Sequence, residues 1–300
     1  MKKTNLFAIL VAILVAGTYY FEFYKSQKDE EAKAEQNKVV RFVPEQINKV
    51  QVENAKGKVV LQRSTEGWSI TEPLEDWADP QFADDFVNGL GTEVSKEVAS
   101  EGDAVQWAVY GLDKGFNKVT FMNQKGESQI ISVSEKKNFE GNSFLRRDVE
   151  NKVLIGTSQW LMRSQAGVME FRDKRLFRGK IGSVEEISLK NQKDQLKFAM
   201  KNTKWVSVDK PEIKLDQNKV REILSSLNEM QASDFVKSIP AGTKDMATLS
   251  LKLKDKNWSA KLSQSKDKAI FAQVSEPAFV LQMQPGQADR FFDMTLMSLR

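Results

Sequence analysis

The sequence predicts an α+β protein, with an N-terminal transmembrane helix followed by two duplicated, mainly antiparallel β-sheet repeats, each with one or two short packed helices. The duplication is inferred from residues 47–90 and 184–227, which align with each other without a gap at a constant offset. The sheets rest on short segments in which apolar and polar residues alternate between turn residues. Runs of strands interrupted by single helices favour antiparallel sheets over alternating βαβ units.

Both copies predict the same series of elements: three strands, the third containing a Trp, and then a helix that begins at an Asp. Residues shared by the copies include Asn54 and Asn191, Lys56 and Lys193, Trp68 and Trp205, Asp79 and Asp216, and Leu90 and Leu227. The Asp can accept hydrogen bonds from the free N–H groups of the first helical turn. Pro80 suits that turn because it has no N–H to leave unpaired.

The remaining elements follow in chain order. In the first repeat we expect strands over 39–43, 50–52, 59–62, 67–70, 119–122, 129–133, 143–146 and 152–155, and a helix over 158–165 capped by Thr157. In the second we expect strands over 249–253, 259–262, 270–274 and 279–283, and a final helix after Pro285 and Gly286. Period-two alternation within the strands indicates that each sheet buries one face.

The first 24 residues predict a membrane anchor. Lys2 and Lys3 precede an apolar run that ends in aromatic residues, and its roughly 19 residues would span about 28 Å as a helix, close to a hydrocarbon core of about 30 Å. The expected anchor residues are Leu6, Phe7, Ile9, Leu10, Val11, Ile13, Leu14, Val15, Tyr19 and Tyr20. The Lys pair predicts a cytoplasmic N-terminus, and hence a single-pass inner-membrane protein with an extracytoplasmic body.

A cleaved signal peptide is the alternative, because Val15, Ala16 and Gly17 offer small residues at a cleavage position. Residues 25–38 mix charges of both signs and predict a linker. The expected organisation is therefore an anchor over 1–24, this linker, a first α+β repeat over 39–179 and a second over 180–300.

Composition excludes several functions. The net charge of +4 comes from 45 basic and 41 acidic residues, a balance too even to indicate a nucleic-acid partner. The chain has neither Cys nor His, which removes thiol nucleophiles, His-based triads and the usual transition-metal ligands. No glycine pattern of a nucleotide-binding loop occurs. We expect no catalytic residue, no metal and no cofactor.

Two acidic pairs and several Trp residues keep other interpretations open. Asp84-Asp85 and Glu185-Glu186 would suit a carboxylate-based hydrolase, although solvated surface charge is the simpler reading. Trp68 and Trp205 share a repeat position, which favours a core role in both copies. The other candidates, Trp107 and Trp160, could form an aromatic surface for glycans.

The segment between the repeats is strongly basic. Its candidate partner-contact residues are Arg172, Lys174, Arg175 and Arg178. They could bind phosphate groups or an acidic partner. The alternative is a connector that turns Phe171, Leu176 and Phe177 inward and its charges outward.

Four short motifs make the chain resemble the family catalogued as domain of unknown function 4340, over most of residues 39–240. They are the pair Gly67-Trp68, the turn at 110–113, the strand at 153–155 and the Arg-Asp-Lys segment at 172–174. In the turn, Tyr-Gly-Leu-Asp, the glycine can adopt a positive φ, so we interpret the motif as structural.

The resemblance implies an envelope accessory role, because members of the family are often encoded near, or fused to, parts of gliding-type ABC transport systems. We therefore expect a non-enzymatic, membrane-anchored envelope protein that acts as a binding or accessory subunit of an ABC-type, permease-like membrane complex. A glycan- or peptidoglycan-binding protein is the alternative, and an envelope hydrolase is the third hypothesis.

Overall fold

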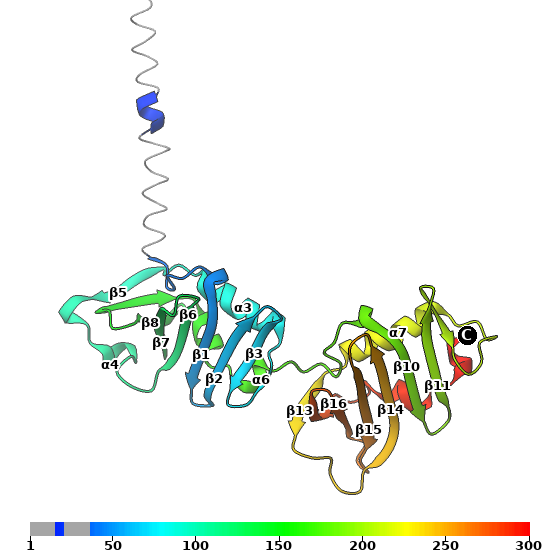
Figure 1. The fold of residues 1–300 in the computed structure, drawn as a ribbon. Coiled ribbons are helices and arrows are strands. Elements are labelled where there is room, and N and C mark those ends of the chain that lie inside the picture. Colours follow the sequence, from blue (N-terminus) through cyan, green and yellow to red (C-terminus); the bar gives the residue numbers. More distant parts are fainter. Residues whose placement is uncertain (1–15, 21–36) are drawn as a thin grey trace, which may run out of the picture. The chain divides into compact units, whose positions relative to one another are not determined.

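The computed structural model describes residues 16–20 and 37–300 of the chain (Figure 1). Their contacts form two units, with the boundary between Asp173 and Lys174. The expected boundary lies slightly later, between residues 179 and 180. Each unit has its own sheet and its own hydrophobic core, so the two are described in turn.

The first unit is built on a nine-stranded antiparallel sheet of order β4-β3-β2-β1-β6-β7-β8-β9-β5. Its strands are β1 (Ile47–Asn54), β2 (Gly57–Ser64), β3 (Gly67–Glu72), β4 (Asp76–Trp77), β5 (Glu97–Glu101), β6 (Asn117–Asn123), β7 (Ser128–Lys137), β8 (Ser143–Arg147) and β9 (Lys152–Gly156). Alternate residues such as Val50 and Val52 face the core, as a period of two requires.

This unit also contains short helices, three of which contribute buried side chains to its core. The helices are η2 (Pro44–Gln46), α3 (Pro80–Gly91), η3 (Gly102–Ala104), α4 (Trp107–Tyr110), α5 (Ser158–Ser164) and α6 (Val168–Phe171). Helix α3 begins where predicted, because the Asp79 side chain accepts a hydrogen bond from the N–H of Phe82 at 3.0 Å. Phe86 of α3 and Trp160 of α5 are fully buried and join the sheet residues in one core.

The second unit is built on an eight-stranded antiparallel sheet of order β12-β11-β10-β14-β15-β16-β17-β13. Its strands are β10 (Val184–Asn191), β11 (Gln195–Lys201), β12 (Lys204–Ser207), β13 (Ala232–Val236), β14 (Lys244–Leu253), β15 (Asn257–Gln264), β16 (Ile270–Ser275) and β17 (Ala278–Met283). Its helices are η4 (Ile181–Ser183), α7 (Gln217–Glu229), α8 (Asp289–Asp293) and η5 (Leu296–Leu299). Helix α7 is capped by Asp216.

The two sheets share one strand order. Strands β3, β2, β1, β6, β7, β8, β9 and β5 of the first correspond to β12, β11, β10, β14, β15, β16, β17 and β13 of the second, and only β4 has no counterpart. Trp68 and Trp205 lie on corresponding strands and are 5% and 3% exposed. The prediction that both rings belong to the core is confirmed.

The predicted fold class needs correction. Both units are mainly antiparallel β-sheet with a few short helices, rather than α+β. Strands β4, β5 and β13 were not predicted, because they lie at sheet edges, where one side is open and the alternation of apolar residues is weak. The expected strand over 39–43 is also wrong, because consecutive Val39 and Val40 are both fully buried instead of alternating.

The predicted transmembrane helix is corrected as well. Within residues 16–20 and 37–300, no helix is long and apolar enough to cross a membrane. The longest, α7, has 13 residues and rises about 20 Å, well short of a core of about 30 Å. Of the expected anchor, Leu6 to Val15 lie outside the described residues, while Tyr19 and Tyr20 are exposed. The same finding contradicts the predicted single-pass inner-membrane location.

Candidate binding site

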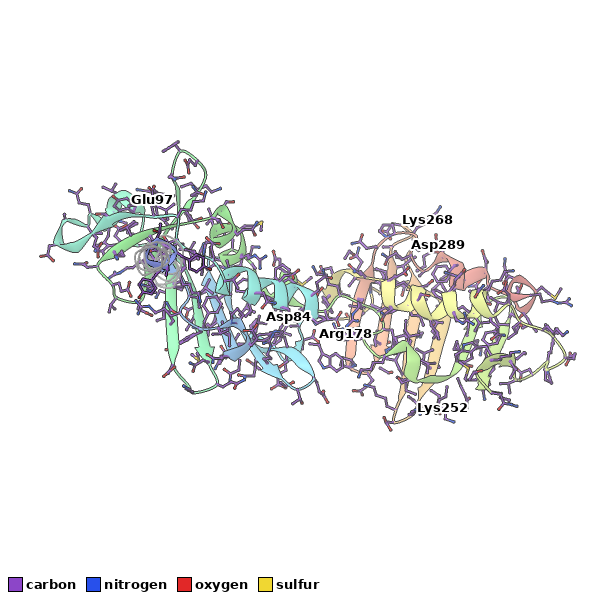
Figure 2. The ribbon with its side chains drawn as sticks, turned by 90° about the horizontal axis from the view of Figure 1, so that it is seen from above. Asp84, Glu97, Arg178, Lys252, Lys268 and Asp289 are labelled. Atoms are coloured by element: carbon purple, nitrogen blue, oxygen red, sulfur yellow. The ribbon has the colours of Figure 1, made fainter. Side chains whose placement is uncertain are left out.

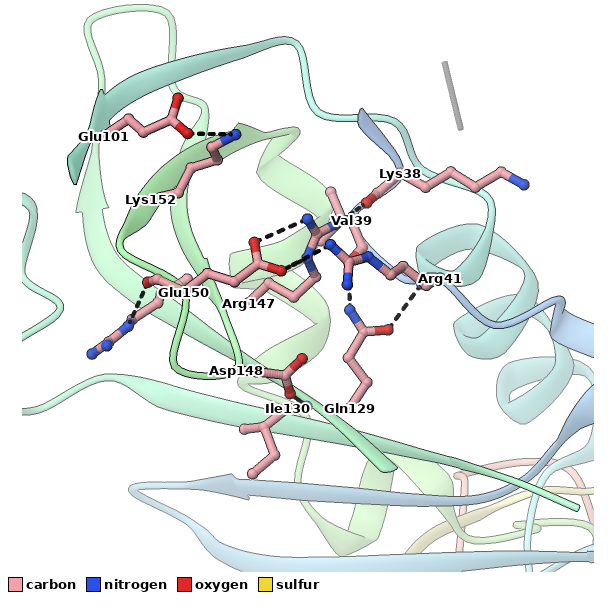
Figure 3. A network of polar contacts seen from close by, with 11 residues as sticks. Lys38, Val39, Arg41, Glu101, Gln129, Ile130, Arg147, Asp148, Glu150 and Lys152 are labelled. Atoms are coloured by element: carbon pink, nitrogen blue, oxygen red, sulfur yellow. Dashed lines mark hydrogen bonds and ion pairs between the residues drawn. The ribbon is translucent and has the colours of Figure 1, made fainter. Parts of the chain in front are cut away.

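A charged hollow of about 750 Å³ lies at one end of the first sheet. It is lined by Arg41, Glu101, Gly102, Arg147, Glu150, Asn151 and Lys152. The sheet register brings these residues together, because Lys152 at the start of β9 pairs with Glu101 at the end of β5. The turn between β8 and β9 supplies Glu150 and Asn151, next to Arg147 at the end of β8 (Figure 3).

Arg147 and Glu150 form the fixed part of the wall. The Arg147 Nε and Nη2 atoms donate to the two Glu150 carboxylate oxygens, each at 2.9 Å, and Nη1 donates to the carbonyl of Lys38 at 2.6 Å. The Arg147 side chain is only 5% exposed. A two-pronged ion pair of this kind fixes orientation as well as charge.

Arg41 brings the segment before β1 to the same place. Its Nη2 donates to Glu150 at 2.9 Å, and its backbone N–H donates to the Gln129 side chain at 2.9 Å. Gln129 in turn donates to the Val39 carbonyl at 3.0 Å. Side chains of the sheet therefore hold this segment, which explains why Val39 and Val40 are buried without forming a strand.

The β8–β9 turn is held from both sides. Asp148 has a φ of 49° and accepts a hydrogen bond from the Ile130 N–H at 2.7 Å. Arg146 donates to the carbonyls of Val149 and Glu150 while its guanidinium lies 4.1 Å from the centre of the Trp107 ring. The turn thus presents Val149, which is 88% exposed, beside the hollow.

The charges of the hollow are paired. Glu150 faces two guanidinium groups, and Glu101 lies 3.1 Å from the Lys152 amine. In the part of the chain that the structure describes, no group of three or more acidic side chains is placed to hold a metal ion. Such a lining can recognise charged groups of a ligand, and its outer members, Arg41 and Glu101, are more than half exposed.

One member of each predicted acidic pair, Asp84 and Glu186, forms ion pairs within its own unit. Asp84 accepts hydrogen bonds from Arg63 at 2.6 Å and from the Trp68 indole at 2.9 Å. In the second unit, the hydrogen bond from Lys252 lowers the pKa of Glu186, and the same contact raises the pKa of Lys252.

The structure separates the predicted partner-contact residues. Arg172, in the first unit, is mostly buried in an ion pair with Asp76 at 2.7 Å. Arg178, in the second, is buried with its guanidinium 4.3 Å from the centre of the Phe279 ring. Lys174 and Arg175 are partly exposed, and both have backbone contacts within the second unit.

The aromatic candidates also differ in position. Trp160 is fully buried, so it cannot contribute to a surface for glycans. Trp107 is half-buried, and Arg146 lies over its ring. The predicted positive φ of Gly111 is confirmed at 65°, and it ends α4. There Tyr110 packs edge-on against Phe144, their ring centres 5.1 Å apart, so the motif is structural.

No residue that lines the hollow was among the predicted site residues. The two flanking strands, over 143–146 and 152–155, were predicted, and an Arg three residues before a Glu was a local signal for one of the ion pairs. No local signal joins Arg41 to Glu150, because 109 residues separate them. This contact exists only once the sheet has formed.

Fold and site together define a class: a duplicated, mainly antiparallel β protein with a charged hollow at one end of its first sheet. The chain belongs to the family described as Domain of unknown function (DUF4340), whose model matches residues 92–254, more than half of the chain. The match runs from the first unit into β14 of the second, which confirms the resemblance. No curated protein and no solved structure is significantly similar to the chain.

Proposed function

We propose that this protein is a non-enzymatic binding or accessory subunit, and that the charged hollow of the first unit recognises charged groups of its partner. The observation that carries the proposal is the arrangement of Arg147, Glu150 and Arg41. A buried arginine holds the carboxylate in place, and the carboxylate orients a second, exposed arginine toward solvent. Groups that are oriented before binding lose less conformational entropy when a ligand arrives.

The pairing of the acids supports binding rather than proton transfer. A general acid or base needs a carboxyl group that can exchange its proton with a substrate. Glu150 is engaged by both arginines, and Glu101 by Lys152. This geometry suits complementarity to a partner that carries both positive and negative side chains.

The partner that we propose is an ABC-type membrane complex, on the basis of the family resemblance alone. The test is in-cell crosslinking of the tagged full-length chain, followed by mass spectrometry of the proteins and glycans recovered with it. We expect to recover a permease and its ATPase. Recovery of glycan material alone, or of no partner, would contradict this proposal, and the first of these would favour the glycan-binding alternative.

Charge-reversal variants connect that result to the hollow. Arg41→Glu should reduce recovery of the partner, because Arg41 is 60% exposed and lines the hollow. Lys58→Glu is the matched control, since Lys58 forms an exposed ion pair with Glu72 in the same unit but does not line the hollow. Equal recovery with both variants would show that the partner binds elsewhere.

A further inference from the structure

The most exposed large apolar side chain among the described residues is Phe139, which is 97% exposed at the tip of the β7–β8 hairpin. Single exposed apolar residues are common on protein surfaces and need no special explanation. Phe139 differs because its loop is ordered, and because the second unit shows what this loop looks like without it.

Hydrogen bonds hold the loop around Phe139 in one conformation. The Asn138 side chain accepts hydrogen bonds from the backbone N–H groups of Glu140 and Asn142, at 3.0 and 2.8 Å. The Asn142 side chain donates to Glu140 at 2.8 Å, and Gly141 takes a φ of 82°. The ring is therefore presented to solvent by a fixed support instead of a mobile loop.

The β15–β16 hairpin of the second unit has the same loop. In the first unit the Asn138 N–H donates to Asn142 and the Gly141 N–H donates to Asn138. In the second, the Ser265 N–H donates to Ala269 and the Lys268 N–H donates to Ser265. Lys268 has a φ of 66°, in the same left-handed region as Gly141.

The position of Phe139 is occupied in that second loop by Lys266, which is followed by Asp267 and by Lys268 (labelled in Figure 2). All three residues are exposed. The same loop therefore forms with a charged residue at the position of the ring, and the fold does not require an aromatic side chain there.

Helix α4 is held against the stem of the same β7–β8 hairpin. The Lys136 amine, in the stem of the hairpin, donates to the carbonyls of Ala108 and Val109 at the end of α4, at 2.8 and 3.2 Å. Val109 is itself 58% exposed. Among the described residues of the second unit, no helix lies between β13 and β14, where α4 would correspond. The first unit alone thus has both the exposed ring and a helix held against the stem of its hairpin.

We propose that Phe139 is an anchor that inserts into an apolar pocket of a protein partner. The charges around it favour a protein over an anionic lipid surface, because exposed Glu135 and Glu140 balance Lys136 and Lys137 and leave no basic excess. Aromatic side chains, Phe among them, are enriched at protein interfaces, and a support that is already formed reduces the entropy lost on binding. The inference deepens the proposed function by naming an anchor for the same partner.

The first test uses the residue of the sister loop. Phe139→Lys in the full-length chain should leave thermal unfolding unchanged, because the side chain is exposed and the loop accepts Lys in the second unit. It should reduce partner recovery by at least about tenfold, as expected for an interface anchor. Phe139→Leu should retain part of the binding, and Lys266→Ala, the matched control, should retain all of it.

The second test places the photocrosslinker p-benzoylphenylalanine at residue 139 or, as a control, at residue 266 in cells. We expect an adduct with one protein at 139 and none with that protein at 266, and the captured protein should lose its binding to Phe139→Lys. An adduct with a second copy of this chain would overturn the inference. So would Phe139-dependent flotation with vesicles of phosphatidylcholine and phosphatidylglycerol, or the absence of any adduct.

The outcomes separate the two proposals. A recovered partner that binds Phe139→Lys as well as the natural chain overturns the anchor and leaves the proposed function standing. A protein adduct at 139 whose binding depends on the ring, but which is no ABC component, supports the anchor and overturns the proposed partner. No partner by either method overturns both.

Discussion

The two units have the same strand order but pair equivalent backbone groups in different ways. At the edge of the first sheet, the Ala78 N–H donates to the Trp68 carbonyl at 3.1 Å, next to the short strand β4. At the equivalent edge of the second, the Gln217 side chain bonds to both the N–H and the carbonyl of Trp205, at 2.7 and 2.9 Å. The backbone groups must be paired in both copies, but the fold leaves the means open.

Other contacts are retained in both units. The Asn54 side chain donates to the carbonyls of Ser164 and Ala166, and Asn191 donates to those of Phe291 and Met294. What the copies share therefore marks what the fold needs. What differs, including α4 and Phe139, marks where one copy could acquire a binding role without loss of the fold.

The largest expected effect tests the shared core. Trp68→Ala and Trp205→Ala should each lower the free energy of unfolding of their own unit by about 3–5 kcal/mol, because both rings are buried. Hydrogen exchange read by mass spectrometry, with peptides assigned to each unit, measures the two effects separately. Val149→Ala, at an exposed site of the first unit, should change it by less than about 0.5 kcal/mol.

Substitution by Phe sharpens this comparison. Trp68→Phe removes the hydrogen bond from the indole to Asp84, a loss of about 1 kcal/mol beyond the change in ring size. No such bond is seen for Trp205 in the part of the chain that the structure describes, so Trp205→Phe should be milder. Equal losses for the two Phe variants would show that the Asp84 contact contributes nothing to stability.

The next effect tests the shared asparagines. Asn54→Ala and Asn191→Ala should each destabilise their unit by about 2 kcal/mol, because each leaves two backbone carbonyls without their donor. Chemical denaturation of the full chain, with exchange assigning the loss to one unit, is the measurement. A large loss in only one unit would break the equivalence of the two positions.

A smaller effect concerns α4, which belongs to the first unit alone. Gly111→Ala should destabilise by about 1–2 kcal/mol, because a Cβ there would meet the Ser134 hydroxyl at 2.7 Å in addition to the strain of a positive φ. Gly115→Ala is the control, since Gly115 has the same φ of 65° but open space around it. Equal losses, measured by chemical denaturation, would mean that Ser134 moves aside freely.

The smallest effect is a dependence on pH. Partial burial acts to raise the pKa of Glu170, but hydrogen bonds from Lys56 and from the Gly167 N–H outweigh it and lower the pKa below its ordinary value of 4.5. The contribution to stability is therefore complete above about pH 4.5 and is lost as the pH falls through the lowered folded value.

Because the pair is well exposed, this contribution should amount to about 0.5 kcal/mol or less. In Glu170→Gln, the free energy of unfolding should fall by that much less as the pH is lowered below about 4.5. Denaturant titrations at a series of pH values measure this difference. Lys58→Gln, which removes another exposed pair of the same unit, controls for general charge effects. An unchanged acid profile in Glu170→Gln would assign the acid sensitivity to other carboxylates.

Patterns in the sequence predicted the repeat, most of its central strands and the helices capped by Asp79 and Asp216. These features depend on residues close together in the chain: alternation over a few positions, a capping carboxylate, a glycine such as Gly111 that can adopt a positive φ. The conserved spacing of Trp68 and Trp205 also identified two core residues, because an equivalent position in two copies has an equivalent environment.

Four features depend on contacts between residues far apart in the chain. They are the edge strands, the path of residues 38–41, the charged hollow and the exposure of Phe139. Arg41 meets Glu150 only after β1 and β6 have paired and β8 has joined the sheet, and nothing local to either residue specifies that neighbour. Exposure likewise depends on what packs above a residue. Phe is an apolar residue type that usually lies in a core, but Phe139 is at a hairpin tip, where nothing in the first unit covers it.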